Sequence, residues 1–200
     1  MSAATLPLFP LQTVLFPGGP LSLRIFEPRY LDLVRRCLKE RSAFGVVLIL
    51  EGAEAGPVTT IAPIGTTARL VDFETLPGGL LGAACLGERR FRVLRHWREG
   101  DGLNVAEVEY LADPAPCALP RALAHLAELL RELLPRLGSD YTHVEARYED
   151  AGWVGNRWAE ILPLAPSAKQ SLLELDDVLE RLQQVAAWSS RHAAATPADR

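Results

Sequence analysis

The sequence predicts an α+β fold with a strand-rich amino-terminal half and three helices in the carboxy-terminal half. Up to about Tyr110, apolar and polar residues mostly alternate with a period of two, which is typical of strands with one solvated face. After Ala112 to Pro116, apolar residues recur at steps of three and four, which is typical of helices. Turn-forming residues such as Pro77–Gly79 and Glu99–Gly102 separate the predicted strands.

The composition indicates a soluble, compact protein. The chain has 200 residues, of which 48% are hydrophobic, and a net charge of -4. An acidic chain of this kind is not generally attracted to nucleic acid or anionic lipid. No segment reaches the roughly 18 apolar residues of a membrane span, and residues 1–4 lack the basic residues of a signal peptide. We therefore expect a cytoplasmic location and no membrane partner.

The stretch LPLFPLQTVLFPGGPLSLRIFEPRY, residues 6–30, is apolar and also rich in proline. Because proline cannot donate to a sheet ladder, Leu6–Leu11 is predicted to be a short strand at the edge or at the start of the sheet. Phe16–Pro20 is predicted to be a turn. Leu21–Phe26, in which apolar residues alternate with Ser22 and Arg24, is predicted to be a strand.

A helix and a buried strand are predicted next. Pro28 is suited to the first position of a helix, where its missing N–H costs nothing, and the helix is expected to end at Lys39. The continuous apolar run Phe44–Leu50 predicts a strand buried on both sides. The face of the helix expected to be buried carries Tyr30, Val34, Cys37 and Leu38.

Five arginines interleaved with Phe91 and Trp97 are the most suggestive charged feature: Arg89, Arg90, Arg92, Arg95 and Arg98. Such a cluster can bind single-stranded nucleic acid by charge and stacking. Alternatively, these arginines form the solvent face of a strand beside another strand that carries Glu107 and Glu109, since opposite charges on neighbouring strands stabilise a sheet. The chain is acidic overall, so we favour the second interpretation and expect no nucleic acid partner.

Three helices are predicted in the carboxy-terminal half. The first is ended by Pro135 and Gly138 and carries Leu123, Leu126, Leu130 and Leu133 on one face, with His125, Glu128 and Glu132 opposite. The second starts after Asp150, stops before Pro163 and buries Val154, Trp158 and Ile161. The third opens with a capping box of Ser167 and Gln170, and its apolar face carries Leu172, Leu175, Leu179, Leu182 and Ala186. Residues 193–200 are expected to fray.

No catalytic constellation, cofactor site or metal site is found in the sequence. There is no phosphate-binding loop, no nucleophile elbow and no zinc-protease motif. Ser167 and Lys169 fit a helix start better than a catalytic dyad. The dispersed residues His96, His125, His143 and His192 do not suggest a metal site, and neither disulfides nor zinc are expected at Cys37, Cys85 and Cys117. An aromatic pocket is possible at Trp153, Trp158 and Trp188, but helical spacing favours a core role.

Four segments in order resemble the amino-terminal domain of the ATP-dependent Lon protease, and most closely its bacterial stand-alone relatives. They are LPLFPLQTVLFPGGPLSLRIFEPRYLDLV, PIGTTARL, GERRFRVL and WAEILPLAPSAKQSLLELDDVLERL, and the resemblance covers about Leu6 to Val185. It implies a PUA-like β-barrel over residues 1–112, with one helix near 28–39, and a helical bundle over 117–192 packed against the barrel as one unit. It also suggests that Gly65 and Gly87 let strands bend.

The resemblance implies a protein-binding function without enzymatic activity. Nothing in these residues resembles the ATPase and protease modules, so neither activity is carried over. What remains is recognition of an unfolded or tagged polypeptide, or docking on a larger protein partner. The route could be β-addition at a strand edge or an apolar groove between barrel and bundle, and the sequence does not choose between them. RNA binding through the arginines from Arg89 to Arg98 is the alternative function. The sequence identifies no binding residues and no oligomeric state.

Overall fold

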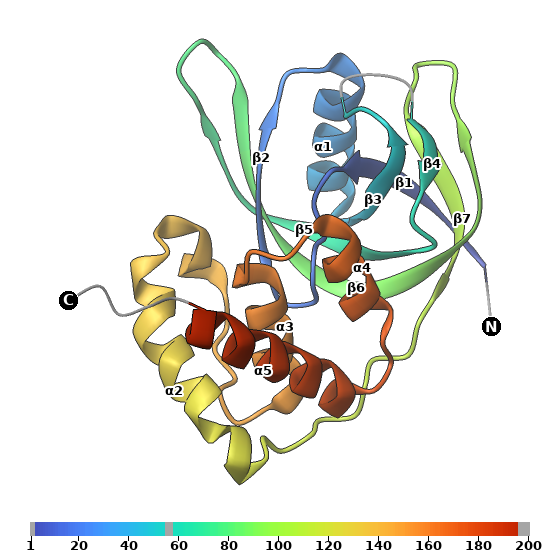
Figure 1. Cartoon of the computed structure of the whole chain (residues 1–200). Helices are drawn as coiled ribbons and strands as arrows, with labels where there is room; N and C mark the ends of the chain where they lie inside the picture. The colour runs from blue at the N-terminus through green and yellow to red at the C-terminus, as the bar shows by residue number, and fades with distance from the viewer. Residues whose placement is uncertain (1–2, 55–57, 196–200) are drawn as a thin grey trace.

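The structure, a computed structural model, describes residues 3–54 and 58–195 and confirms the α+β class (Figure 1). The strands and the first helix form the upper part of the molecule in Figure 1, and the other helices form the lower part. The first part contains β1 (Ala4–Leu11), β2 (Pro20–Ile25), α1 (Pro28–Glu40), β3 (Phe44–Gly52), β4 (Val58–Ile61), β5 (Ile64–Thr75), β6 (Leu81–Arg98) and β7 (Asn104–Tyr110). The second contains η1 (Arg121–Leu123), α2 (Ala124–Leu133), η2 (Leu134–Arg136), η3 (Ser139–His143), α3 (Ala151–Ile161), α4 (Pro166–Glu174) and α5 (Val178–Ala195).

The sheet closes on itself. Its strand order is β1-β7-β6-β5-β3-β4. β1 also pairs with β3 in parallel, which joins the two ends of the run β1-β7-β6-β5-β3. Five strands therefore form a ring, as a barrel requires. β4 extends the sheet from β3, and β2 pairs with the first half of β6 outside the ring.

The expectation that the first strand lies at an edge is wrong, because β1 has a partner on each flank. Ala4–Leu8 pairs with β7, and Leu8–Leu11 pairs with β3. The two pairings overlap only at Leu8. Pro7 and Pro10 therefore each lie where one flank alone is paired, which is why two prolines are tolerated in a strand of the ring.

The predicted turns and the helix after Pro28 are confirmed, with two corrections to the predicted buried faces. Gly78 and Gly79 adopt positive φ in the β5–β6 turn, and Glu99 and Leu103 close the β6–β7 turn. On α1, Leu38 is exposed, and Leu33 is buried in its place. The end of β3 is also exposed at Leu50, because the strand extends past the core there.

The third predicted helix is two helices in the structure, α4 and α5, with a break at residues 175–177. The predicted capping box is also wrong, because α4 begins at Pro166 and its N-cap is Ala165. Gln170 is instead buried, and its side-chain amide donates to the Ile64 carbonyl of β5 at 2.9 Å. α5 continues to Ala195, and the rest of the predicted frayed tail lies outside the described residues.

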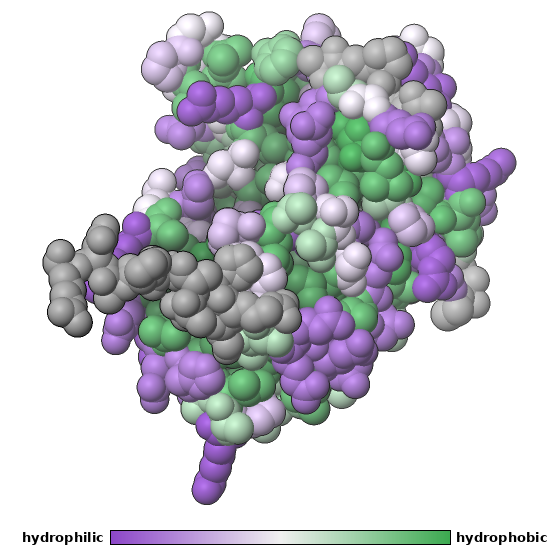
Figure 2. Space-filling view, in the orientation of Figure 1, coloured by the Kyte–Doolittle hydropathy of each residue, from purple (hydrophilic) through white to green (hydrophobic). Residues whose placement is uncertain are grey.

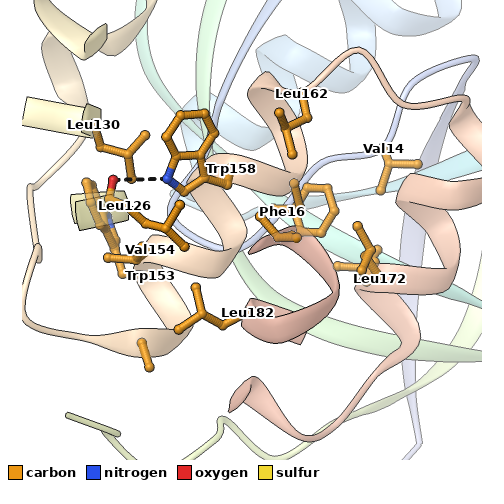
Figure 3. Close-up of a cluster of buried hydrophobic side chains, with 14 of the residues drawn as sticks. Val14, Phe16, Leu126, Leu130, Trp153, Val154, Trp158, Leu162, Leu172 and Leu182 are labelled. Atoms are coloured by element: carbon orange, nitrogen blue, oxygen red, sulfur yellow. Dashed lines mark hydrogen bonds between the residues drawn. The ribbon is translucent and has the colours of Figure 1, made fainter. Parts of the chain in front are cut away.

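The largest apolar cluster lies between the strands and the helices (Figure 3). Val14 and Phe16, from the segment between β1 and β2, contribute to it together with side chains from β3, β5 and all four carboxy-terminal helices. The helices therefore cover one side of the strand half with a shared core. The predicted boundaries at residues 112 and 117 stay a prediction, and this shared core favours a single folding unit. None of the described helices is long and apolar enough to cross a membrane.

Gly65 and Gly87 are needed for close approach between backbone segments. A Cβ atom on Gly65 would lie 2.4 Å from the Val46 carbonyl oxygen, and one on Gly87 would lie 2.3 Å from that of Phe16. The first register shift of β5 against β6 lies between the pairs Thr66–Arg90 and Ala68–Gly87, so on β6 the irregularity begins at Gly87. At Gly87 the close approach of the Phe16 backbone and a sheet irregularity therefore coincide, and the bending role of both glycines stays a prediction.

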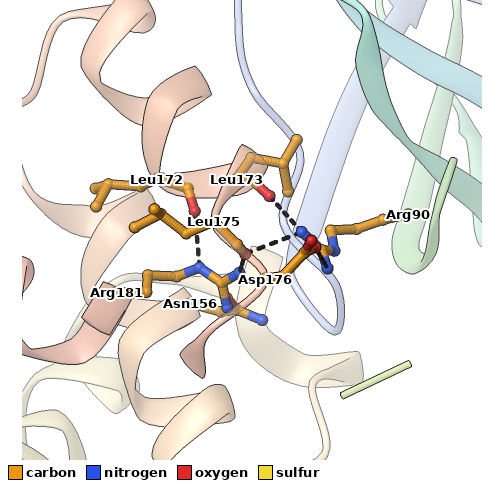
Figure 4. Close-up of polar contacts among 7 residues, drawn as sticks. All are labelled: Arg90, Asn156, Leu172, Leu173, Leu175, Asp176 and Arg181. Carbon is orange, nitrogen blue, oxygen red and sulfur yellow. Dashed lines mark hydrogen bonds and ion pairs between the residues drawn. The ribbon is translucent and has the colours of Figure 1, made fainter. Parts of the chain in front are cut away.

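Two buried arginines connect the sheet to the break between α4 and α5 (Figure 4). Arg90 of β6 donates to the carbonyls of Leu173 and Leu175 at 2.8 and 3.0 Å and pairs with Asp176 at 2.7 Å. Arg181 of α5 donates to the Leu172 carbonyl at 2.8 Å. These guanidinium groups satisfy the carbonyls that the end of α4 leaves without helical partners and thereby stabilise the break between the two helices.

Candidate functional site

A groove of about 340 Å³, lined mainly by apolar side chains, lies beside β2; we call it the β2 groove. Its floor is apolar and buried, with Phe9 stacked on Tyr30 at a ring separation of 3.9 Å. Burial raises the pKa of the Tyr30 hydroxyl, so the floor carries no ionised phenol near neutral pH. The groove is lined by Phe9, Leu11, Thr13, Leu21, Ser22, Leu23, Arg24, Ile25, Phe26, Glu27, Tyr30 and Glu54.

The groove follows an unpaired strand edge. Leu21 to Glu27 are consecutive and all line it, and side chains from both faces of a strand meet only along its edge. β2 pairs with β6 over Pro20–Ile25, and within the described residues no strand pairs with its other flank. Such an edge presents backbone N–H and C=O groups that can pair with another extended chain.

The rim of the groove combines one large exposed aromatic ring with charged groups. Phe26 is 60% exposed, directly after the last residue of β2. Glu27 forms an ion pair with Arg29 at 2.8 Å, and Glu54 accepts a hydrogen bond from the backbone of Gln12 at 2.6 Å. The rim can therefore contact an apolar side chain at Phe26 and polar groups around it.

A second cavity, of about 560 Å³, lies on the opposite face of β2, between the β5–β6 hairpin and η3. The surface in Figure 2 is indented between the hairpin at the upper left and the helices below it. Its walls are partly apolar, as at Phe73, and carry the charged side chains Asp72, Glu74 and Asp140 together with Arg24 and His143. Ser22 of β2 donates to Asp140 of η3 at 2.6 Å across it. Both faces of β2 therefore border hollow surface.

Within the described part of the chain, the residues named above as catalytic or metal-binding candidates form no catalytic arrangement. Lys169 donates to the backbone carbonyl of Glu160 at 2.6 Å, and Ser167 is exposed. No group of three or more described histidine, cysteine, aspartate or glutamate side chains is arranged to hold a metal ion. Cys37 and Cys85 are buried, and burial raises the pKa of Cys85 to about 12. Trp153 and Trp158 are buried in the shared core (Figure 3), as the core interpretation predicts.

The arginine run does not form one open cationic surface. Arg95 pairs with Glu107 at 2.5 Å and Arg92 lies 3.9 Å from Glu109, which confirms the predicted cross-strand pairing for these two residues. Arg90 is 5% exposed and belongs to the α4–α5 junction, so the expectation that it faces solvent is wrong. The other two arginines of the run also have partners: Arg89 forms an ion pair with Asp113 at 3.9 Å, and Arg98 donates to the Gly102 carbonyl at 3.1 Å.

Sequence reasoning identified β2 as a strand but missed that its edge is open. One available signal was Pro20 at the first position of the strand, where proline is confined to edges and strand starts. Another was Phe26, an aromatic residue placed between the strand and the helix-starting Pro28. No sequence signal indicated that Glu54, distant in the chain, lies on the same rim.

Comparison with known proteins relates most of the described chain to one protein family. The family model of the ATP-dependent protease La (LON) substrate-binding domain matches residues 5–188. The Lon protease of Paraburkholderia phytofirmans is 31% identical over 179 residues, which are 86% of this chain and 22% of that protein. Protein cereblon of Xenopus tropicalis is 26% identical over 204 residues, 94% of this chain and 42% of that protein. The chain therefore spans about a fifth of the length of the Lon proteases it matches.

Solved structures agree with this result. The crystal structure of a Lon N-terminal domain protein from Xanthomonas campestris superposes with a TM-score of 0.76 at 40% identity, covering 92% of this chain and 98% of that one. The N-terminal domain of Mycobacterium avium complex Lon protease superposes with a TM-score of 0.66 at 18% identity, which supports the fold alone.

Proposed function

The chain belongs to the family of LON substrate-binding domains, and from this premise we propose that it binds extended polypeptide segments in the β2 groove. The observation that carries the proposal is the run of consecutive residues from Leu21 to Glu27 along the unpaired flank of β2. A polypeptide added there gains backbone hydrogen bonds from the strand edge and buries alternate side chains in the groove. The clients are unfolded or tagged polypeptides, and a larger protein partner is the alternative.

Of the two routes that the sequence left open, the strand edge is better supported. The space between strands and helices is occupied by the shared core, in which Phe16, Leu130 and Leu182 are fully buried. A groove for a client would have to open that core, except at the hollow between the β5–β6 hairpin and η3, where Asp72, Glu74 and Asp140 suit an apolar segment less well than the β2 groove does. The edge of β2 requires no such rearrangement, because its apolar floor and its unpaired flank are already adjacent.

The proposed function is binding without catalysis, in the cytoplasm. The family match lies within the substrate-binding domain, and the activity of the full-length relatives is not transferred to this chain. Of the charged groups that line the groove, Glu27 is paired with Arg29 and Glu54 accepts a hydrogen bond from the backbone of Gln12. They can orient a bound chain but do not form a nucleophile with a base.

Fluorescence anisotropy of a labelled unfolded polypeptide tests this proposal. Phe26→Ser should weaken binding, because the exposed ring on the rim is lost. Leu129→Ser is a matched control, since Leu129 is 49% exposed but lies on α2 and lines neither of the two hollows beside β2. Equal effects of the two substitutions, or no binding by the unmodified protein, would contradict the proposal.

The backbone part of the proposal needs a separate measurement. N-methylation of the polypeptide removes its amide donors without adding charge. Two peptides of the same sequence, methylated at alternate odd or even positions, should differ in affinity, because only one set of amides faces the strand edge in an added strand. Equal affinities would favour side-chain contacts alone.

A further inference from the structure

The turn that begins β2 is held from the helical half by Arg157 of α3. This side chain is fully buried and donates to the carbonyl of Pro17 at 3.0 Å and to that of Gly18. Asn156, one residue earlier, directs its amide to the same Pro17 carbonyl at 3.4 Å. Two neighbouring side chains of α3 thus contact the last residues before the binding edge.

Glu160 keeps the Arg157 guanidinium in place. The carboxylate lies 2.9 Å from Arg157 and accepts a hydrogen bond from the Tyr141 hydroxyl of η3 at 2.8 Å. The charged groups that face it are Arg157 on α3, Lys169 on α4, and Tyr141 with neighbouring Asp140 on η3. Burial raises the pKa of Glu160, and Arg157 opposes that shift. We call Arg157, Glu160 and Tyr141 the α3 clamp.

The turn is shaped to fit the α3 clamp. Gly18 has a φ of +71°, and a Cβ atom on Gly19 would lie 2.3 Å from a Glu160 carboxylate oxygen. On its other side the turn is bonded to β6, with Gly18 donating to Gly87 at 2.7 Å and Gly87 donating to Gly19 at 2.9 Å. The start of β2 is therefore fixed between the sheet and the helices.

The α3 clamp and the groove meet at a small cavity of about 180 Å³. Its walls include Leu21 and Ser22 of β2, which also line the groove, together with Tyr141 and Glu160 of the clamp. The hydrogen bond from Ser22 to Asp140 lies at this boundary. A displacement of the clamp would therefore reach the first residues of the binding edge through direct contacts.

We propose that Arg157, with Glu160 and Tyr141, is a positioning residue for polypeptide binding, and that the helical half thereby sets the geometry of the β2 edge. The inference rests on the proposed function, in that the β2 groove is taken as the binding site. None of the three clamp side chains lines that groove. They act through the turn before β2. The turn fixes the start of β2, and the backbone of β2 pairs with the client.

The same substitution at two buried arginines distinguishes an effect on the geometry of β2 from a general loss of stability. Arg157→Lys keeps the charge and loses the planar fork that reaches two carbonyls at once. Arg90→Lys makes the same change at the α4–α5 junction, where Arg90 also joins the sheet to the helices but contacts neither β2 nor its turn. Tyr141→Phe removes only the hydroxyl that donates a hydrogen bond to Glu160. This variant replaces Arg157→Lys in the experiment if Arg157→Lys fails to fold.

Hydrogen exchange of the β2 amides is the first measurement, since it needs no ligand. Arg157→Lys should speed exchange over Leu21–Ile25 by about tenfold, which corresponds to a loss of about 1.4 kcal/mol of local protection. Tyr141→Phe should act in the same direction with a smaller effect. In Arg90→Lys, the β2 amides should exchange no faster than the amides in the rest of the sheet.

Polypeptide binding is the second measurement, and affinity should fall in parallel with β2 protection, by about tenfold for Arg157→Lys. Equal β2 exchange in the two arginine variants, or unchanged exchange in Arg157→Lys and Tyr141→Phe, would overturn the inference. Faster β2 exchange with unchanged affinity would also overturn it. If the unmodified protein binds no polypeptide, the proposed function fails, and the exchange data still decide whether the clamp holds the strand.

Discussion

Arg90 and Arg181, which are 91 positions apart in the chain, donate to the same acceptor, the backbone carbonyl of Leu175 (Figure 4). Burial, and secondly the neighbouring positive charge of Arg90, lower the pKa of Arg181 to about 10. Two guanidinium groups lie together here because the end of α4 offers several carbonyls and Asp176 supplies a carboxylate. The break between α4 and α5 is thus a polar joint within a mostly apolar contact.

Replacing Arg90 by alanine should lower the free energy of unfolding by more than about 2 kcal/mol, because buried carbonyls lose their donor. Arg92→Ala is the control, since Arg92 lies two positions away on the same strand and is exposed, and it should change stability by less than about 0.5 kcal/mol. Urea unfolding curves compare the two. Similar midpoints for both variants would show that the joint contributes little.

Leu182→Ala should destabilise the protein by about 2–5 kcal/mol, because Leu182 is fully buried in the shared core (Figure 3). Leu179, which the sequence placed on the same apolar face, is only half-buried, so Leu179→Ala should cost less. Leu129→Ala, at a site 49% exposed, is the control. Thermal or chemical unfolding measures all three, and an equal cost at residues 182 and 129 would refute the shared core.

Glu160 should make the folded state more stable as pH falls. Burial raises its pKa in the folded protein above the ordinary value of 4.5, so the folded state binds the proton more readily than the unfolded state. This contribution is complete below the unfolded pKa and is lost as pH rises through the folded pKa. Relative to Glu160→Gln, the unmodified protein should therefore gain stability from neutral pH down towards 4.5.

Denaturant unfolding at a series of pH values measures that difference. Glu128→Gln, on the exposed side of α2, is the control and should give a curve parallel to that of the unmodified protein. A constant difference between the protein and Glu160→Gln over the same range would mean that the buried carboxylate is not coupled to folding.

The three thiols should react at two different rates. Cys37 and Cys85 are buried and burial raises the pKa of each, so little thiolate is accessible, whereas Cys117 is half-buried. Titration of the native protein with a thiol reagent should show one fast group and two slow ones, and three fast groups after denaturation. A single rate for all three in the native protein would contradict the burial.

Polypeptide binding should depend only mildly on salt, and RNA binding should be weak. The acceptors around the arginine run reduce its attraction for a polyanion, as at Arg95 with Glu107. Phosphate contacts would instead make affinity fall steeply with salt. Anisotropy with labelled RNA and labelled unfolded polypeptide, from low to high salt, compares the two. Tight RNA binding that is lost with salt and in an Arg92→Ala, Arg95→Ala variant would reverse the order of functions.

Features that depend on neighbours in the sequence were predicted well. Pro28 at the first position of α1 and the glycines of the β5–β6 turn have local backbone preferences that tertiary contacts do not override. The change from a period of two to helical spacing likewise gave the α+β class. The family resemblance added the arrangement of these parts, which periodicity alone does not contain.

Features that depend on distant partners could not be predicted. Alternation placed Arg90 on a solvent face, but the α4–α5 break, over 80 positions later, supplies its acceptors. The apolar spacing from Leu172 to Ala186 suggested one helix, whereas the arginines of the joint, together with Asp177, which accepts hydrogen bonds from the backbone of Leu179 and Glu180, make a break favourable. The β2 groove was missed for the same reason, because whether a strand has a free flank depends on where all the other strands lie.

The double pairing of β1 has a consequence for synthesis of the protein on the ribosome. β1 emerges first, but its amino-terminal half pairs with β7, whose last residue is Tyr110. The ring cannot close until the residues up to about Tyr110 have left the exit tunnel, and until then the apolar side chains of Leu6 and Leu8 have no permanent cover. Long-range pairing of this kind slows folding and leaves strand edges exposed to other chains. Newly made copies should therefore be at greatest risk of aggregation in the interval before β7 is available.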